Sequence, residues 1–214
     1  FQGRLALTHR APSVLVTTPL GDVIEHQILR RSGRFGAWLD FTTPGRWIVE
    51  VMATGPRGPV VVALFPVFVD VDPGLERPES RRVESSPRDV SPAATLLRLL
   101  NEERRRASLL PVEHSEELAS VAIGHCRDMS RHRFFGHVSP RQGDLTERLA
   151  SAGIAATRVA ENLVRSSSAH RAHSQLMESP SHRANILDPD LTHVGIGVAE
   201  GNGELLVTQI FTTW

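Results

Sequence analysis

Histidine and acidic residues recur in three short polar phrases in the second half of the chain. They occupy residues 135–140 (FGHVSP), 160–163 (AENL) and 178–187 (ESPSHRANIL), and a fourth phrase follows at residues 194–198 (VGIGV). Imidazole nitrogens and carboxylate oxygens are the usual ligands of a divalent transition metal where thiolates are absent. Apolar packing does not explain these phrases, so we interpret them as parts of one site.

Together the four phrases closely resemble the CAP superfamily of cysteine-rich secretory proteins, venom antigens and plant pathogenesis-related proteins. The nearest match is its bacterial, disulfide-free branch, and the resemblance covers about residues 93–214. It implies an α-β-α sandwich with a central antiparallel sheet. It also implies an open cleft, lined by two histidines and two acidic residues, that binds zinc in some members. By position, His137, Glu161 and His182 match three of these residues. Glu178 is the candidate for the fourth, and an alignment shift of one would give that role to Ser179.

The residue types in this set are suited to zinc, because two imidazoles and two carboxylates fit a tetrahedral site. His182 lies three residues past Ser179, with Pro180 between them, so we expect it in the first turn of a short helix. A helix N-terminus disfavours a protonated imidazole and keeps His182 able to bind a metal. We expect five further residues to line the cleft or to support the ligands: Ser139, Asn162, Ser181, Arg183 and Asn185.

Three functions are alternatives. The first is a secreted or cell-envelope binding module whose ligand is a lipid, a peptide or a cell-wall component. The second is a metal-dependent hydrolase, in which zinc activates water and Glu161 or Glu178 is the base. The third uses Ser139 or Ser181 as a nucleophile, although neither lies in a glycine-rich nucleophile elbow. We favour binding, because the recognisable residues define a cleft and not an enclosed substrate pocket. Whether the protein is an enzyme stays open.

Composition restricts the partners. The 214 residues carry 24 basic and 24 acidic side chains, a balance that argues against nucleic acid or an anionic membrane. Cys126 is the single cysteine, which excludes an intramolecular disulfide, and its place on an apolar helix stripe predicts a buried, inert thiol. No apolar run approaches the roughly 18 residues of a membrane span. We expect the protein to be a monomer. Because the sequence begins at Phe1 and not at a methionine, we also expect it to be a trimmed or processed piece of a longer chain.

Residues 1–70 predict an all-β domain, an immunoglobulin-like sandwich truncated at its start. Strand-like runs at residues 14–18, 22–29, 35–41, 46–54 and 60–70 are separated by turn residues. Residues 43–51 loosely resemble a late strand of bacterial immunoglobulin-like modules, and Pro66 predicts an edge or bulged strand. Residues 71–92 are rich in charge and proline and predict an extended linker; the alternative is a segment ordered along one domain's surface.

Residues 93–214 predict an α+β domain, with helices first and strands last. Helix N-caps are expected at Ser91, Ser115 and Asp144, the last in a capping box with Glu147, and Gly153 ends the third helix. A fourth helix is expected over about residues 168–178. A hairpin of residues 192–199 and 204–212 closes the domain.

Overall fold

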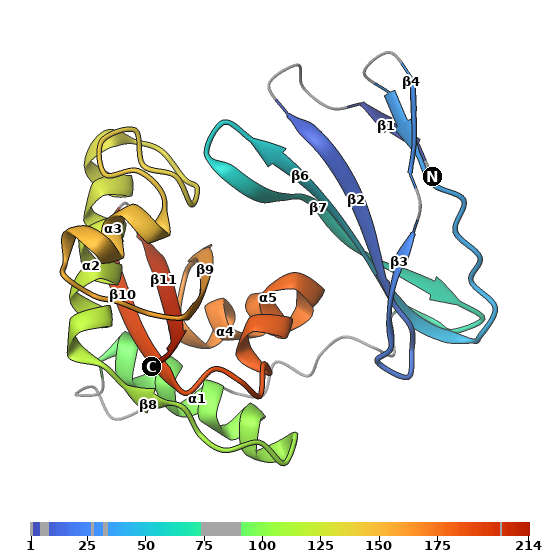
Figure 1. Cartoon of the computed structure of the whole chain (residues 1–214). Helices are drawn as coiled ribbons and strands as arrows, with labels where there is room; N and C mark the ends of the chain where they lie inside the picture. The colour runs from blue at the N-terminus through green and yellow to red at the C-terminus, as the bar shows by residue number, and fades with distance from the viewer. Residues whose placement is uncertain (1, 5–8, 27, 32–33, 74–90, 202) are drawn as a thin grey trace. The chain divides into compact units, whose positions relative to one another are not determined.

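The computed structural model describes residues 2–4, 9–26, 28–31, 34–73, 91–201 and 203–214. The chain divides into two compact units, Phe1–Glu84 and Ser85–Trp214 (Figure 1). Most of the predicted linker at residues 71–92 lies outside the described residues.

The described residues of the first unit form two antiparallel sheets. Its larger sheet has the order β3 (Val23–His26), β2 (Arg10–Thr17), β6 (Gly45–Gly55) and β7 (Gly58–Val69). The smaller has the order β1 (Gln2–Arg4), β5 (Arg34–Gly36) and β4 (Leu29–Arg31). Phe35 of the smaller sheet shares one core with Val14, Trp47 and Val49 of the larger sheet. The predicted strand at residues 35–41 ends at Gly36, and the immunoglobulin-like interpretation stays a prediction.

Pro66 lies on an edge strand, as its missing N–H predicts. Strand β7 pairs only with β6 in the described sheet, and their register shifts between Val51 and Met52. A proline at this edge removes no hydrogen bond from a central ladder.

The second unit is built on a four-stranded sheet with the order β8 (Glu113–His114), β10 (His193–Gly201), β11 (Glu204–Thr213) and β9 (Arg158–Ser166). Strands β10 and β11 form the predicted hairpin. Strand β9 is antiparallel to β11 and lies at the edge. The sequence did not predict β9, although this strand carries Glu161 and Asn162.

Five helices are described in this unit: α1 (Pro92–Arg106), α2 (Glu116–His132), α3 (Leu145–Ser151), α4 (Ala169–Glu178) and α5 (Pro180–Ile186). The predicted N-caps are confirmed, because Ser91, Ser115 and Asp144 each accept a backbone N–H three residues further on. Asp144 and Glu147 form the capping box, and Gly153 follows α3 with φ = +73°. These helix starts depend on contacts within one turn, which is why a local sequence pattern predicts them.

The helices cover both faces of the sheet (Figure 1). On one face, Leu118 of α2 and Leu149 of α3 pack against Ile210. On the other face, α1, α4 and α5 pack against Val207 and Phe211 through a cluster that includes Leu96, Leu176 and Ile186. This is the three-layer α-β-α arrangement that the resemblance implies.

Packing explains the glycine-rich phrase at residues 194–198, contrary to the expectation from the sequence. A Cβ atom on Gly195 would lie 2.2 Å from the backbone of Leu118, and one on Gly197 would lie 2.2 Å from the backbone of Ala122. Both positions therefore need glycine, because helix α2 lies directly on strand β10.

Candidate functional site

The loop after α2 brings His137 to the edge strand β9. His137 Nδ1 lies 2.8 Å from Glu161 Oε2, and the Glu161 side chain is 3% exposed. Arg148 of α3 donates from Nη2 to Glu161 Oε1 at 2.5 Å. Both carboxylate oxygens are thus engaged, one by an imidazole and one by a guanidinium.

This contact determines which nitrogen of His137 is available to a ligand. A carboxylate only accepts hydrogen bonds, so Nδ1 carries a proton, and in the neutral form of the ring the lone pair lies on Nε2. Among the described residues, Nε2 of His137 has no hydrogen-bond partner, and the side chain is 23% exposed. Nε2 is therefore the ring atom with which His137 can bind a metal or another ligand.

His182 occupies the first turn of α5, as predicted. Ser179 is the N-cap of that helix, and its Oγ lies 2.7 Å from His182 Nδ1. Burial, and then the nearby His137, lower the pKa of His182 to about 4. The imidazole is therefore neutral near pH 7, as expected, although burial and not the helix N-terminus is the main cause.

The structure separates the two candidates for the fourth position. Glu178 is the last residue of α4 and is exposed, whereas Ser179 is buried and contacts His182. Because the chain turns at Ser179 and Pro180 between two helices, Glu178 and His182 do not share a helix face. The residue beside His182 is thus Ser179.

Asn162 links β9 to α5. Its Nδ2 donates to the carbonyl oxygen of His182 at 3.1 Å and to Gln209 Oε1 at 3.2 Å. Its Oδ1 accepts from Asn185 Nδ2 at 2.8 Å. Asn162 therefore bonds to the backbone at His182, and Asn185 bonds to Asn162; their part in ligand binding stays a prediction. Arg183, expected in the same role, is directed elsewhere and donates to the Met177 carbonyl at 3.5 Å.

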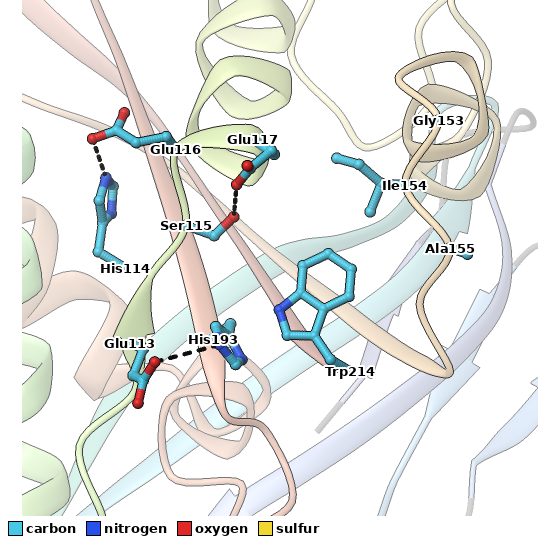
Figure 2. A pocket seen from close by; sticks show the side chains of 10 residues that line it. All are labelled: Glu113, His114, Ser115, Glu116, Glu117, Gly153, Ile154, Ala155, His193 and Trp214. Atoms are coloured by element: carbon cyan, nitrogen blue, oxygen red, sulfur yellow. Dashed lines mark hydrogen bonds and ion pairs between the residues drawn. The ribbon is translucent and has the colours of Figure 1, made fainter.

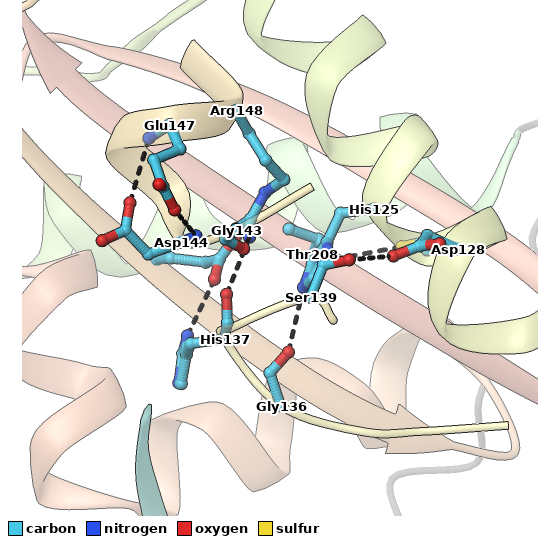
Figure 3. Close-up of polar contacts among 12 residues, drawn as sticks. His125, Asp128, Gly136, His137, Ser139, Gly143, Asp144, Glu147, Arg148 and Thr208 are labelled. Atoms are coloured by element: carbon cyan, nitrogen blue, oxygen red, sulfur yellow. Dashed lines mark hydrogen bonds and ion pairs between the residues drawn. The ribbon is translucent and has the colours of Figure 1, made fainter. Parts of the chain in front are cut away.

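Two contacts with α2 anchor the loop that carries His137 (Figure 3). Ser139 Oγ donates to Asp128 Oδ2 at 2.6 Å and accepts from the backbone N–H groups of Arg141 and Gln142. His125 Nε2 lies 3.0 Å from the Gly136 carbonyl oxygen, and burial lowers the pKa of His125. Ser139 is thus a structural residue, and the predicted serine nucleophile finds no support here.

Ser181, the other serine considered, has its Oγ 3.2 Å from Ser179 Oγ. Cys126 is buried, as predicted, and its Sγ lies 3.1 Å from Thr208 Oγ1. Burial raises the pKa of this thiol to about 11, so it is an inert core residue.

The donor set fits a metal ion only in part. Within the described ranges, no group of three or more His, Cys, Asp or Glu side chains is arranged to hold a metal ion. Glu161 is engaged by Arg148 and His137, and Glu178 is exposed. Two imidazoles remain, and imidazole is a usual zinc ligand.

A separate pocket of about 610 Å³ lies at the N-terminal end of α2 (Figure 2). His114 Nε2 lies 3.2 Å from Glu116 Oε1, and His193 Nε2 lies 3.6 Å from Glu113 Oε2. The indole of Trp214 meets the His193 ring edge-on. The pocket contains none of the predicted site residues, so its two histidines provide a comparison for experiments on His137 and His182.

No helix of the described residues has both the length and the apolar character needed to cross a membrane.

Two curated relatives come from Bacillus subtilis. The uncharacterized protein YkwD is 32% identical over 118 residues, which are 54% of this chain and 46% of the relative. The uncharacterized membrane protein YlbC is 33% identical over 104 residues, which are 48% of this chain and 30% of the relative. The chain thus spans less than half the length of either relative.

Solved structures share the fold. An extracellular protein with an SCP domain from Bacillus anthracis has a TM-score of 0.55 at 21% identity, covering 88% of this chain and 67% of that protein. An outer surface protein of Borrelia burgdorferi has a TM-score of 0.52 at 18% identity, covering 55% and 89%. The model of the cysteine-rich secretory protein family, CAP, matches residues 97–211, more than half of the sequence. The chain therefore belongs to the CAP family.

Proposed function

We propose that the CAP unit is a binding module with an open cleft in which His137 and His182 face the ligand. The observation that carries this proposal is the shared arrangement of the two imidazoles. Each is held through Nδ1, by Glu161 in one case and by Ser179 in the other. Neither Nε2 atom has a partner within the described part of the chain. Two fixed imidazoles with unpartnered Nε2 atoms suit a ligand that accepts a lone pair or donates a hydrogen bond.

Zinc is the metal that we propose for this pair. His137 and His182 would hold it, and the ion would supply a Lewis acid with coordination positions open to a ligand. Glu161 would support the ion indirectly, by orienting His137, because metal-binding histidines commonly donate their other N–H to a carboxylate. Glu178 would take no part unless the end of α4 rearranged.

The hydrolase alternative needs a carboxylate that is free to take a proton from water. Both oxygens of Glu161 are already engaged, and Glu178 is exposed at the end of α4. A base held in an ion pair with arginine is a poor proton acceptor. We therefore place binding before hydrolysis.

We further propose that the protein is secreted or resides in the cell envelope, and that it is a monomer. The fold likeness to an extracellular protein of Bacillus anthracis and to an outer surface protein of Borrelia burgdorferi supports this location. The all-β unit would then be an immunoglobulin-like spacer or adhesion unit, joined by the linker of residues 71–92. The ligand would be a lipid, a peptide or a cell-wall component.

The first experiment measures the melting temperature with and without zinc. A ligand at about 100 times its Kd stabilises the folded state by about 2.7 kcal/mol, so the wild type should melt several degrees higher with zinc. The double variant His137→Ala/His182→Ala should lose this rise. The matched control, His114→Ala/His193→Ala, removes the two histidines of the separate pocket and should keep it. An unchanged rise in the first double variant would place zinc elsewhere.

For the hydrolase alternative, peptides, esters and cell-wall glycans should be screened for turnover, together with Glu161→Gln. Turnover that disappears in Glu161→Gln would favour hydrolysis over our proposal. Absence of turnover across the three substrate classes is the expected result.

A further inference from the structure

We propose that Arg148 is the positioning residue of this site and that it sets which ring nitrogen of His137 meets the ligand. The inference rests on the proposed function, because it concerns the same histidine. Arg148 donates from Nη1 to the His137 carbonyl at 2.7 Å and to the Gly143 carbonyl at 3.1 Å. From Nη2 it donates to Glu161 at 2.5 Å, and its side chain is only 2% exposed.

One guanidinium thus fixes His137 at two points. It holds the backbone of His137 directly, and it holds the ring through the Glu161 carboxylate. The loop and strand β9 are tied together by the planar fork of one arginine, which presents several N–H groups in fixed directions. A lysine has a single ammonium group and cannot reproduce this geometry.

The hydrogen bonds from Arg148 also hold the Glu161 carboxylate in place beside His137. With the Arg148 charge removed, Glu161 would lie buried with only the imidazole beside it. A buried carboxylate without its cation tends to turn toward water. Nδ1 of His137 would then lose its fixed acceptor, and the proton would be shared between the two ring nitrogens.

Other contacts keep the loop in place when Arg148 is replaced. Ser139 bonds to Asp128, and His125 contacts the Gly136 carbonyl, so α2 holds the loop independently (Figure 3). Arg148 Nε is buried and has no hydrogen-bond partner in the described structure. Removing one partner of a buried ion pair is strongly destabilising, so circular dichroism first checks whether Arg148→Met folds, and Arg148→Lys is the second variant.

The test uses metal-free protein with ¹⁵N-labelled histidine, and NMR reports the tautomer of His137. The wild type should show the Nδ1-protonated form. Arg148→Met should show both tautomers, and Arg148→Lys should lie between the two. Arg141→Met is the charge-matched control, because Arg141 is an exposed arginine on the same loop; it should match the wild type.

Zinc affinity is the second readout, measured by competition with a chromophoric chelator. Loss of a group that orients a metal-binding histidine typically weakens binding about 10–100-fold, and we expect this loss in Arg148→Met. If the wild type binds no zinc, the metal part of the proposed function fails, but the tautomer comparison still decides the role of Arg148. A folded Arg148→Met with the wild-type tautomer would overturn the inference. If Arg148→Met does not fold, the wild-type tautomer in Arg148→Lys would overturn it.

Discussion

Glu161 and Asn162 are consecutive on β9, yet their side chains leave opposite faces of the sheet. Glu161 pairs across the strands with Ile210, on the face covered by α2 and α3, and contacts His137. Asn162 pairs with Gln209 on the other face and bonds to the His182 backbone. Because β9 is an edge strand, the loop after α2 and the start of α5 can approach one another around it. The alternation of a β-strand therefore assembles the site.

Replacing Asn162 should remove a support of the His182 backbone and lower the free energy of unfolding. Asn162→Ala removes the bonds to the His182 carbonyl, Gln209 and Asn185. Leaving buried polar partners unsatisfied typically costs about 1–3 kcal/mol, so urea unfolding should show a loss of that size. Asn185→Ala removes only one of these bonds and should cost less. Equal losses in the two variants would contradict the central place of Asn162.

Gly197→Ala should destabilise the second unit strongly. Its Cβ would lie 2.2 Å from the backbone of Ala122 in α2, so helix and sheet must separate, at a cost of about 3 kcal/mol or more. Gly124→Ala is the control on the same helix, because a Cβ there meets nothing within 4 Å. That change should raise stability by about 0.5–1 kcal/mol. Chemical denaturation measures the free energy of unfolding of both variants. Similar values for Gly197→Ala and Gly124→Ala would show that α2 does not lie so close to β10.

Arg104 should be essential to the fold and not to ligand binding. It is 2% exposed and donates to four backbone carbonyls, those of Leu110, Ile186, Asp188 and Leu191. Arg104→Met should cost about 3 kcal/mol or more, because several buried acceptors lose a charged donor. Arg98→Ala, which removes an exposed pair with Glu102, should cost under about 0.5 kcal/mol. A small loss in Arg104→Met would mean that other donors reach these carbonyls.

Acid should destabilise the protein partly through His182. Its pKa is lowered to about 4 in the folded state, below the value of about 6.5 in an unfolded chain, so the unfolded state binds the proton more readily. Above about pH 6.5, His182 does not reduce the free energy of unfolding. As the pH falls from about 6.5 to 4, its contribution to the loss of unfolding free energy grows to about 3 kcal/mol. Unfolding free energies measured between pH 7.5 and 4 should fall less steeply in His182→Gln. Equal slopes in the two proteins would contradict the burial of this imidazole.

Contacts within one helical turn could be predicted from the sequence, and contacts between distant segments could not. Ser91, Ser115 and Asp144 each cap the helix that begins at the next residue and accept a backbone N–H three residues ahead, so their roles are visible locally. Strand β9 was missed because it mixes polar site residues with apolar ones and lacks a clear strand alternation. The packing role of Gly195 was also missed, because only the approach of α2 reveals it.

In the candidate site, too, some residues could be predicted from the sequence, and others depend on contacts between distant segments. His137, Glu161 and His182 could be found because their phrases resemble a family. The structure brings Glu161 to His137, and Asn162, the next residue, to the backbone of His182. Arg148 gave no signal, because a buried arginine in a short helix looks like any surface arginine of that helix. Whether Glu178 or Ser179 adjoins His182 depended on the direction of one turn, which spacing alone does not determine.

The most direct measurement is anomalous scattering from a crystal soaked in zinc. Our account predicts one strong peak at coordination distance, about 2.0–2.1 Å, from Nε2 of both His137 and His182, with Glu161 still bound to Arg148. A peak on the Glu161 carboxylate, a peak at His114 or His193 alone, or no peak beside His137 and His182 would contradict it.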